Sequence, residues 1–473
     1  MNKTKVVATI GPVSCGREVL KAMIREGLDV VRLNFSHGTH DEHLAVIRAV
    51  RDIDREMGTN TAILADLQGP KLRVGEMKDG GVMLTTSKKV NITTRKITGD
   101  ADTICTNYKE FPVDVKPGEI VLLDDGKITL RVVSTNGKDE VVTEVQQGGI
   151  LSSRKGINLP NTRVSLPSLS EKDMDDLHFA LKHEVDWIGL SFVRKADDIT
   201  SLKQIIESQT SHAKVVAKIE KPEAVNDIDA IVLEADAVMV ARGDLGVEIP
   251  LQQVPLIQKM VIRKCNEQSK PVIVATQMME SMVTNITPTR AEVNDVANAV
   301  LDGADAVMLS GETSVGKYPV EAIRVMNSII EEAEKYAGIY YRDLQAPEEV
   351  DESRFITDSV CYSACRLAMR ARANAIVTMS FSGYTGYKIS SQRPNAHIFV
   401  FTANRKILTQ MSLVWGVSAF YYDKMVSTDQ TIADIRYFLR KQGLIKDGEF
   451  IINIASMPIL EQGMTNMLKL SRV

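Results

Sequence analysis

The sequence is poor in cysteine, and its few cysteines do not cluster. Its 473 residues include five cysteines, an odd number, and none of them forms a CxxC pair. This pattern argues against a disulfide framework and against a zinc cluster, because both need paired or closely spaced thiols. The chain is therefore expected to work in a reducing, cytoplasmic environment.

The chain also lacks a long apolar run and a surplus of charge of either sign. No stretch approaches the roughly 18 apolar residues of a membrane span, and the apolar run in MNKTKVVATIG is too short for a signal peptide. The 57 basic and 61 acidic residues leave a net charge of -4, with no basic arm. We therefore expect neither a membrane nor a nucleic acid as a partner.

What the sequence has instead is a repeated unit, a short β-branched run followed by a segment of helical length. A chain of this length is expected to hold two or three domains. Eight runs fit the pattern: KVVATIG (5–11), VVRLNFS (30–36), TAILADLQ (61–68), WIGLSFV (187–193), KVVAKIE (214–220), AVMVARGD (237–244), PVIVATQ (271–277) and AVMLSGE (306–312). Eight such units predict a closed (β/α)8 TIM barrel, and the recurrence of ADAVMV as ADAVML supports it.

Two further domains are predicted beside the barrel, which would span 1–69 and 170–345. The interval 70–169 is far too long for a β/α connection. Its alternating runs and its turns at PGE and DDG predict an inserted small β-barrel that acts as a lid. After the charged segment LQAPEEVDES, the runs AIVTMS, HIFVFTA, VSAFYYD and FIINIA predict a C-terminal open α/β domain, 346–473.

The stretch GETSVGKY (311–318) is one hydroxyl away from a P-loop. A P-loop ends in Ser or Thr because that hydroxyl ligates the magnesium of the nucleotide. Tyr318 is too long and rigid for this role, and Pro319 redirects the chain at once. We interpret the stretch as the turn that leaves the eighth strand, at the face where barrels keep their active sites.

Charged residues follow two neighbouring strands at that face. Residues two apart on a strand point the same way, so Lys218 pairs with Glu220 on the fifth strand and Arg242 with Asp244 on the sixth. Glu220 and Asp244 would then lie about 5 Å apart, the spacing of adjacent strands. Two carboxylates form a site for magnesium or manganese, whereas either one alone is more simply a solvated or ion-paired strand end.

Other strand ends add cationic and polar groups to this mouth. By the same parity, RLNFSH directs Arg32, Asn34 and Ser36 together and leaves His37 at the rim, while Asp66 ends the third strand and Thr276 the seventh. Such a mouth suits a small, highly anionic substrate. Phosphoryl transfer fits best, because its transition state needs positioning and charge neutralisation. A metal-dependent enolate lyase or aldolase and a non-catalytic sugar-phosphate sensor are the alternatives.

A set of motifs in this order resembles pyruvate kinases over nearly the whole chain. The motifs are RLNFSHGTH, DLQGPKLR, KGINLP, AKIEKPEAV, MVARGDLGVEIP, VIVATQMMESM, PTRAEVNDVANAVLDGADAVMLSGET and the C-terminal SGYT. The resemblance implies a glycolytic kinase that moves the phosphoryl group of phosphoenolpyruvate to ADP, yielding pyruvate and ATP. It also implies a homotetramer that a phosphorylated metabolite regulates allosterically.

The resemblance assigns roles in the chemistry. Glu220 and Asp244 would bind Mg2+ or Mn2+. Lys218 would steady the moving phosphoryl group and the enolate, and Arg32 would neutralise phosphate oxygens.

The resemblance also assigns roles in binding. Arg73, at the lid hinge, would assist with the phosphate, and Thr276 with the backbone N–H groups of Gly243 and Asp244 would hold the substrate carboxylate. The residues that would face the nucleotide are Asn34, His37, Arg73 and Lys155.

The loop SFSGYT in the C-terminal domain matches the family's effector site. It follows the run AIVTM and precedes a helix, so its N–H groups and hydroxyls are expected to hold a phosphate. The residues concerned are Ser380, Ser382, Gly383, Tyr384 and Thr385. An ordinary Ser/Gly turn without a phosphate pocket is the alternative.

One departure from the family concerns potassium. In members that need this ion, the position of Lys71 is Glu and that of Leu67 is typically Thr, whereas the matching ligands Asn34, Ser36 and Asp66 are present here. The ammonium of Lys71 would supply the single positive charge that potassium otherwise brings. We therefore expect activity without K+; the alternative is a solvated surface lysine.

Overall fold

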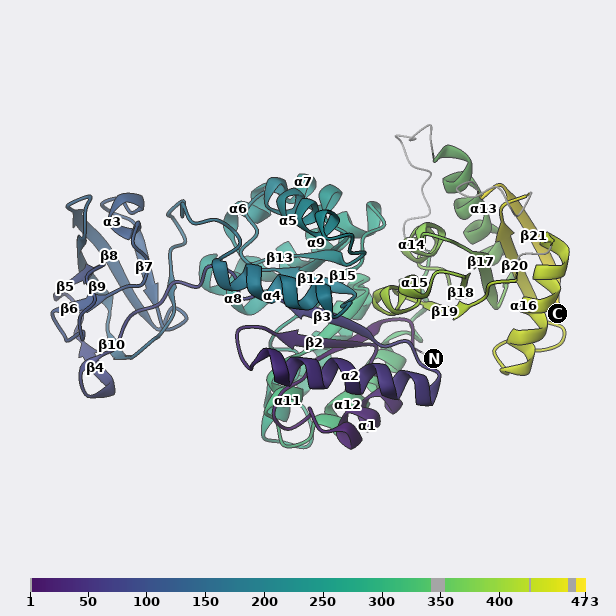
Figure 1. Ribbon diagram of the computed structural model, residues 1–473, viewed down its shortest axis with the longest axis horizontal. Helices are drawn as coiled ribbons and strands as arrows, with labels where there is room; N and C mark the ends of the chain where they lie inside the picture. Colours follow the sequence, from purple (N-terminus) through teal and green to yellow (C-terminus); the bar gives the residue numbers. More distant parts are fainter. Residues whose placement is uncertain (1, 342–353, 425–426, 458–464) are drawn as a thin grey trace.

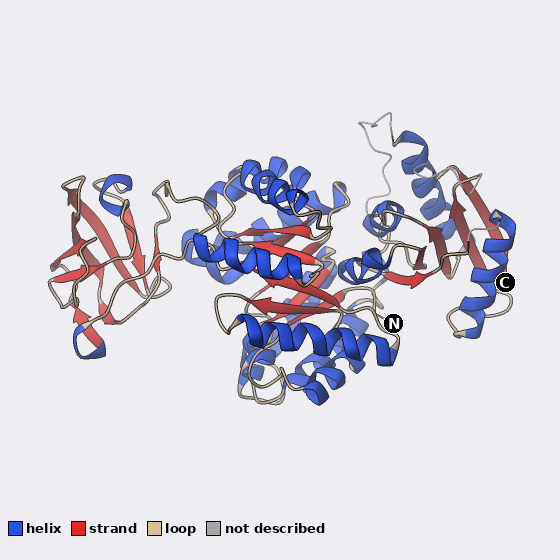
Figure 2. Ribbon diagram, in the orientation of Figure 1, coloured by secondary structure: helices blue, strands red, loops and turns tan. Residues whose placement is uncertain are grey.

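The computed structural model describes residues 2–341, 354–424, 427–457 and 465–473. Figures 1 and 2 show three bodies in a row, with a β-rich domain and a mixed α/β domain on opposite sides of a central barrel. The segment LQAPEEVDES and the predicted boundary at 345/346 lie outside the described residues. The domain boundaries drawn from the sequence therefore remain a prediction.

The central body is a closed barrel of eight parallel strands, as predicted. The strands are β1 (Lys5–Thr9), β2 (Val30–Asn34), β3 (Ala62–Asp66), β12 (Trp187–Leu190), β13 (Lys214–Ile219), β14 (Ala237–Ala241), β15 (Val272–Ala275) and β16 (Ala306–Leu309). Their order around the barrel follows the chain, and β1 closes the ring by pairing with both β2 and β16. Each of the eight predicted runs thus contributes one strand.

Helices surround this barrel, and the sequence marks several of their ends. They are α1 (Arg17–Arg25), α2 (His40–Met57), α4 (Glu171–Lys182), α5 (Ala196–Ser208), α6 (Pro222–Asn226), α7 (Ile228–Glu234), α8 (Arg242–Glu248), α9 (Val254–Glu267), α10 (Arg290–Asp302), α11 (Gly311–Ser314) and α12 (Pro319–Ala333). α10 begins with a capping box between Thr289 and Glu292 and is capped at its C-terminal end by Gly303, whose φ is +97°. α12 begins with a proline, so the chain turns at Tyr318, as the sequence indicated.

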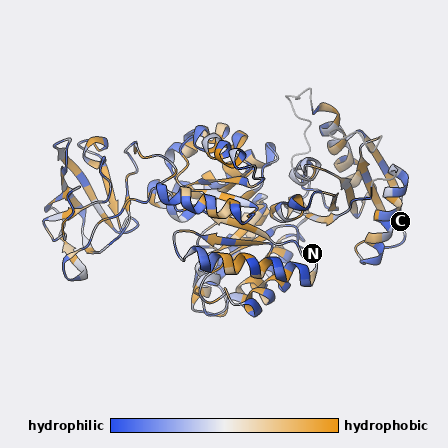
Figure 3. Ribbon diagram, viewed as in Figure 1, coloured by the Kyte–Doolittle hydropathy of each residue, from blue (hydrophilic) through white to orange (hydrophobic). Residues whose placement is uncertain are grey.

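The barrel interior is filled by apolar side chains from alternate strand positions. This inner cluster includes Val30 on β2, Leu64 on β3, Trp187 on β12 and Val216 on β13, all fully buried. Leu413 of the C-terminal domain belongs to the same cluster, so that domain packs against the barrel interior. Figure 3 shows the apolar strands within a shell of helices that carry hydrophilic residues on their outer faces.

The inserted segment folds as a small β domain with one core. Its elements are β4 (Gly81–Leu84), β5 (Lys89–Thr93), β6 (Thr103–Cys105), β7 (Ile120–Leu123), β8 (Ile128–Thr135), β9 (Glu140–Gln147), β10 (Gly149–Ser152), β11 (Ile157–Asn158), the helix α3 (Phe111–Asp114) and the 3-10 turn η1 (Lys78–Gly80). Six strands form one sheet in the order β11-β7-β8-β9-β5-β6, and β10 pairs with β4. Both sheets contribute to one hydrophobic cluster.

The two chain crossings between this insert and the barrel are joined by one carboxylate. The N–H of Gly69, where the chain leaves the barrel, donates to Oδ1 of Asp173 at 2.9 Å. Ser170, where the chain returns, donates to Oδ2 of Asp173 through its backbone N–H at 2.9 Å. Asp173 is fully buried, so the hinge of the insert is held at a fixed point on α4.

The C-terminal body is an open α/β domain, as predicted. Its sheet runs β19-β18-β17-β20-β21, formed by β17 (Ala375–Met379), β18 (His397–Thr402), β19 (Val417–Tyr421), β20 (Phe450–Ala455) and β21 (Met467–Arg472). Its helices are α13 (Phe355–Ala371), α14 (Tyr384–Ser391), α15 (Arg405–Gln410) and α16 (Thr428–Lys441). β21 pairs antiparallel with β20 and was not predicted from the sequence.

Candidate active site

The barrel mouth gathers two cationic side chains around the carboxylate of Asp66. Arg32, Asp66 and Lys218 each lie two residues after a member of the inner cluster, so they point into the barrel. Nε and Nη2 of Arg32 both lie 2.7 Å from Oδ2 of Asp66. Nζ of Lys218 lies 3.2 Å from Oδ1, a charge contact without an aligned hydrogen bond. Burial would raise the pKa of Asp66, but Lys218 and Arg32 hold it below its usual value.

Lys218 is the most enclosed cation of the mouth. Its Nζ lies 2.8 Å from Oε1 of Glu220 and donates to Oγ of Ser191 at 2.7 Å. Burial disfavours the charge, but the carboxylates of Asp66 and Glu220 outweigh it and raise the pKa of the ammonium. Lys218 is therefore a fixed positive charge. Ser191 was not predicted, although the parity of β12, continued two residues beyond Gly189, would have placed it here.

Glu220 and Asp244 fit a divalent ion by the chemistry of their donors. Burial and the nearby charge of Asp244 raise the pKa of Glu220, although the ammonium of Lys218 acts to lower it. The two carboxylates therefore interact electrostatically. Oε2 of Glu220 accepts from the N–H of Phe192 at 2.9 Å. Among the described residues no group of three or more His, Cys, Asp or Glu side chains could hold a metal. An ion here would therefore take further oxygen ligands from substrate and water, as magnesium does.

The expectation that Arg242 and Asp244 share a face of the sixth strand is wrong. β14 ends at Ala241, and the chain turns into α8 at Arg242. Nη1 of Arg242 lies 2.8 Å from Oδ1 of Asp295, and its Nη2 donates to the carbonyl of Thr276 at 2.7 Å. Asp244 stands exposed on the first turn of α8. Period-two parity fails here because it holds only while the chain stays extended.

Thr276 follows β15 and contacts the start of α8. Its Oγ1 accepts from the N–H of Gly243 at 2.7 Å and donates to the carbonyl of Ala275 at 2.6 Å. Gly243 and Thr276 thus lie together, and their role in holding a substrate carboxylate stays a prediction. A substrate carboxylate held by the N–H of Gly243 would have to take the place of the Thr276 hydroxyl.

The turn after β2 carries the next three predicted residues. Oδ1 of Asn34 accepts from the N–H of Ser36 at 3.1 Å, so Ser36 lies in a turn stabilised by Asn34 and not on the strand. His37 is exposed, and its carbonyl oxygen lies 3.0 Å from Nε2 of His43. His43 in turn packs against Phe35, with ring centroids 4.4 Å apart. The turn is therefore anchored at its base while His37 remains accessible at the rim.

The lid residues lie close to the hinge. Nη1 of Arg73 donates to the carbonyl of Arg154 at 3.0 Å, and Nζ of Lys155 lies 2.9 Å from Oδ1 of Asp124. Lys71 is exposed. These contacts keep Arg73 and Lys155 within the lid.

A small cavity of about 60 Å3 lies between lid and barrel. Lys71 and Asn158 line it from the inserted segment, and Asp244 and Lys221 line it from the barrel. Lys71 therefore opens onto the same space as one of the predicted metal ligands.

A buried carboxylate links this part of the lid to α8. Oε1 of Glu248 accepts from Nδ2 of Asn158 at 2.8 Å and lies 2.5 Å from Nζ of Lys221. The Glu248 side chain is 1% exposed. The sequence did not reveal this contact, because it depends on how a lid strand meets a helix about ninety residues further along the chain.

The GETSVGKY stretch serves the architecture of the mouth. Oε1 of Glu312 accepts from the N–H of Met279 at 3.1 Å, and its Oε2 accepts from the N–H of Ser310 at 2.7 Å. The hydroxyl of Thr313 donates to the carbonyl of Thr9 at 2.9 Å. The stretch therefore connects the end of β1 with the loops after β15 and β16.

The predicted effector loop follows β17 and includes the first two residues of α14, and its hydroxyl groups have different surroundings. Oγ of Ser380 accepts from the N–H of Gly383 at 3.0 Å, and Gly383 has a φ of +81°. Ser382 is exposed. Oγ1 of Thr385 lies 2.9 Å from Oγ1 of buried Thr378, so it faces the core. The phenol of Tyr384 donates to Asp358 at 2.8 Å, away from the loop.

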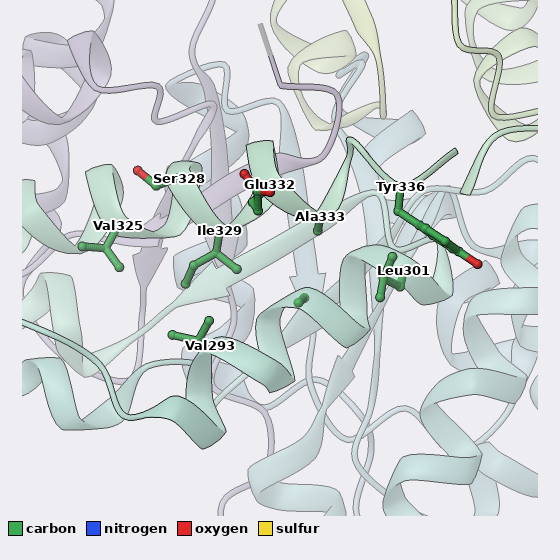
Figure 4. Close-up of a pocket in the computed structure, with 9 residues that line it drawn as sticks. Val293, Leu301, Val325, Ser328, Ile329, Glu332, Ala333 and Tyr336 are labelled. Carbon is green, nitrogen blue, oxygen red and sulfur yellow. The ribbon is translucent and has the colours of Figure 1, made fainter. Parts of the chain in front are cut away.

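An apolar groove of about 620 Å3 lies on the outer surface of the barrel (Figure 4). Its lining comes from α10, from α12 and from Tyr336, three residues after the end of α12: Val293, Ala297, Leu301, Val325, Ser328, Ile329, Glu332, Ala333 and Tyr336. The groove has few polar groups and does not include the strand ends, so it is not a candidate for catalysis.

None of the described helices is both long enough and apolar enough to cross a membrane.

Two protein-family models together match most of the chain. Residues 1–323 match "Pyruvate kinase, barrel domain", and residues 358–471 match "Pyruvate kinase, alpha/beta domain". No finding supports the lyase or aldolase alternative.

Curated relatives and a solved structure agree with these matches. The chain is 43% identical to a pyruvate kinase from Corynebacterium glutamicum over 98% of this chain and 96% of the relative. It is 42% identical to a pyruvate kinase from Mycobacterium tuberculosis strain H37Rv, over 99% and 98%. A crystal structure of a pyruvate kinase from Cryptosporidium parvum superposes with a TM-score of 0.93 at 35% identity, covering 100% of this chain and 96% of that one.

Proposed function

The chain belongs to the pyruvate kinase family, and we propose that the charged mouth of its barrel carries out the family's reaction. The chain is a phosphotransferase that moves the phosphoryl group of phosphoenolpyruvate to ADP and releases pyruvate and ATP. One observation supports placing the chemistry here: the ammonium of Lys218 lies between Asp66 and Glu220, beside the guanidinium of Arg32.

Lys218 and Arg32 supply the charge that the reaction needs. The transferred phosphoryl group carries negative charge on its oxygens, and the leaving enolate is also an anion. Because its pKa is raised, Lys218 stays protonated and acts by its charge rather than by giving up a proton. Asp66 pairs with both cations and fixes their positions, so they need little reorganisation when the substrate binds.

Glu220 and Asp244 are the proposed ligands of the divalent ion that the family requires, and Mg2+ or Mn2+ fits their oxygen donors. The bound ion supplies a positive charge that stabilises the enolate oxygen. Thr276 and the N–H groups of Gly243 and Asp244 are proposed to hold the substrate carboxylate. The closeness of Gly243 to the Thr276 hydroxyl supports this assignment.

The nucleotide is proposed to lie between the rim of the barrel and the lid. Asn34 and His37 would face it from the turn after β2, and Arg73 and Lys155 from the lid. The exposure of His37 supports this arrangement. Lys155 pairs with Asp124 of the lid and therefore moves with the lid. It would meet the nucleotide phosphates when the lid closes.

Lys71 is proposed to make the enzyme independent of potassium. Its exposed ammonium lines the same cavity as Asp244, where a positive charge would act on the phosphates. The predicted potassium ligands are Asn34, Ser36 and Asp66. Asp66 is the only charged residue among these three, and its charge is already compensated because it pairs with Arg32 and Lys218.

The C-terminal domain is proposed to bind a phosphorylated effector at the loop 380–385. The exposed hydroxyl of Ser382 and the N–H groups at the start of α14 support this role. The loop lies in a domain separate from the barrel mouth, so its effect on the reaction would be allosteric.

The chain is also proposed to form a homotetramer in the cytoplasm. The groove between α10 and α12 exposes apolar side chains such as Val293 and Tyr336, which are 37% and 61% exposed. Exposed apolar patches of this kind mark contacts between proteins, and here we expect a second copy of the chain. Sedimentation velocity on the protein and on a Val293→Asp variant tests the assembly; a monomeric parent protein would refute it.

A coupled assay tests the proposed active site. Pyruvate formation from phosphoenolpyruvate is measured with and without ADP and with and without Mg2+. We expect product only when both are present. Turnover that persists after Glu220→Gln and Asp244→Asn are introduced together would move the metal site elsewhere.

A further inference from the structure

The backbone at Thr276 and Gln277 is left-handed. φ is +68° at Thr276 and +54° at Gln277. This conformation is uncommon for residues other than glycine and is an outlier for a β-branched residue such as threonine. It persists only where the surroundings impose it, and such residues gather at functional sites. The contacts that impose it are therefore part of how the barrel mouth is built.

The guanidinium of Arg242 supplies those contacts. Its Nη2 donates to the carbonyl of Thr276 at 2.7 Å and to the carbonyl of Gln277 at 3.3 Å, and it lies 2.8 Å from Sδ of Met278. One nitrogen thus reaches both left-handed residues. The N–H of the next residue, Gly243, donates to Oγ1 of Thr276. The start of α8 therefore fixes Thr276 both at its backbone and at its hydroxyl.

Asp295 orients Arg242 from the other side. Nη1 of Arg242 lies 2.8 Å from Oδ1 of Asp295 on α10 and 3.4 Å from Oε1 of Gln258 on α9. The side chain of Arg242 is only 12% exposed. A planar guanidinium can serve a carboxylate with one nitrogen and two carbonyls with the other, whereas a lysine ammonium is a single point charge.

We propose that Arg242 is a positioning residue for phosphoryl transfer. It holds the Thr276–Gln277 segment in its left-handed conformation, and Asp295 orients it to do so. The proposal rests on the role proposed for Thr276, the binding of the substrate carboxylate. Arg242 itself does not touch the substrate, so its effect on the reaction passes through Thr276.

A double-mutant cycle tests this dependence. The parent protein, Arg242→Met, Thr276→Ala and the double variant are compared by kcat and KM for phosphoenolpyruvate and for ADP. We expect Arg242→Met to lower kcat/KM for phosphoenolpyruvate about tenfold or more, but less than about twofold when Thr276 is already alanine. The KM for ADP should change little. If the effects of the two single substitutions multiply in the double variant, the positioning role of Arg242 is overturned and the role of Thr276 stands. If Thr276→Ala has parental kinetics, the role of Thr276 is overturned, and the positioning role of Arg242 with it.

Arg51 offers a matched control. Its Nη1 donates to the carbonyl of Thr61 at 2.8 Å and its Nη2 to Oδ2 of Asp186 at 2.8 Å, the same kind of contact away from the mouth. Arg51→Met should lower the melting temperature and leave kcat/KM near the parental value. An equal loss of kcat/KM in Arg51→Met would show that Arg242→Met acts through general destabilisation, which would overturn the proposal.

Chemical rescue separates positioning from folding. In an Arg242→Ala variant, added guanidinium ion at low millimolar concentration can occupy the space of the lost side chain and donate to the same carbonyls. We expect guanidinium chloride to raise kcat/KM several-fold, and tetramethylammonium chloride at the same concentration to have no effect. If Arg242→Lys has parental kinetics, the two separate nitrogens of the guanidinium are unnecessary and the proposal is overturned.

Discussion

The ammonium nitrogen of Lys218 lies 2.8 Å from Oε1 of Glu220 in the buried wall of the barrel mouth. Neither charge is solvated in the usual way: Glu220 depends on Lys218 for compensation, and Lys218 depends on both Glu220 and Asp66. Removing one partner from such a group leaves the remaining charge without its counterion, which is costly. The pair would therefore link the proposed catalysis and the proposed metal binding to stability in one place.

Replacing Lys218 with methionine should abolish most of the turnover. The variant keeps the stem of the side chain but removes the positive charge that the phosphoryl group and the enolate would meet. Loss of one preorganised electrostatic group costs on the order of a hundredfold or more in kcat. We expect a smaller change in the KM for phosphoenolpyruvate, because Arg32 and the metal remain. Steady-state kinetics of pyruvate formation measure both quantities.

Lys214 on the same strand is the matched control for Lys218. Its Nζ lies 3.5 Å from Oδ1 of Asp236, at the opposite end of β13. Lys214→Met removes a charge from the same strand without touching the mouth, so its kcat should stay within about twofold of the parental value. A Lys218→Met enzyme with near-parental turnover would refute the assigned role.

The strand periodicity explains why much of the site could be predicted. In an extended chain alternate residues share a face, so the sequence alone was enough to place Arg32, Asp66 and Lys218 in one mouth. The eight repeated units then fixed which end of the barrel they would occupy. Local sequence carries this information because it depends only on strand direction and parity.

What the sequence could not supply depends on contacts between distant segments. The helical turn at Arg242 follows from tertiary contacts with Asp295 and with the loop after β15, which override the strand pattern. The inward direction of the Thr385 hydroxyl likewise depends on Thr378 across the turn. The hydrogen bond between Asn158 and Glu248 joins two domains, and the residue pattern within either domain does not predict it.

His397 should make stability depend on pH. Burial, and then the nearby charge of Lys3, lower the pKa of His397 to about 4. The unfolded chain protonates this side chain near pH 6.5, so its contribution is complete above that pH and is lost as the pH falls toward 4. Between pH 7 and pH 5 we expect a loss of about 2 kcal/mol.

The variant His397→Gln isolates this effect, because glutamine does not titrate in this range. Melting temperatures at pH 7 and pH 5 are compared for the parent, for His397→Gln and for His178→Gln, which alters an exposed histidine on the barrel. The fall in melting temperature should be smaller in His397→Gln and unchanged in His178→Gln. An equal fall in all three proteins would show that other groups govern the acid response.

The two hydroxyl residues of the effector loop should behave differently. Ser382 is exposed, so Ser382→Ala should remove activation by a phosphorylated effector while leaving basal activity and melting temperature nearly unchanged. Thr385→Ala breaks a buried hydrogen bond with Thr378 and should cost about 1 kcal/mol of stability. Initial rates with fructose 1,6-bisphosphate, ribose 5-phosphate and AMP, together with thermal melts, separate these effects. A Ser382→Ala enzyme that still responds fully to the compound that activates the parent would place the effector site elsewhere.

Lys71 should set the response to potassium. Its exposed side chain lines the same lid–barrel cavity as Asp244, so it can approach a phosphate when the lid closes. A single positive charge about 4 Å from a phosphate oxygen is worth roughly 4 kcal/mol at an effective dielectric of 20, comparable to a bound monovalent ion. We therefore expect initial rates of the parent that are flat against potassium concentration in a buffer of organic cations. Lys71→Glu should be weakly active until potassium is added, whereas Lys71→Met, which removes the charge without adding a carboxylate, should stay weak at all concentrations. A parent enzyme that potassium stimulates many-fold would assign the ion to Asn34, Ser36 and Asp66 and leave Lys71 as a surface residue.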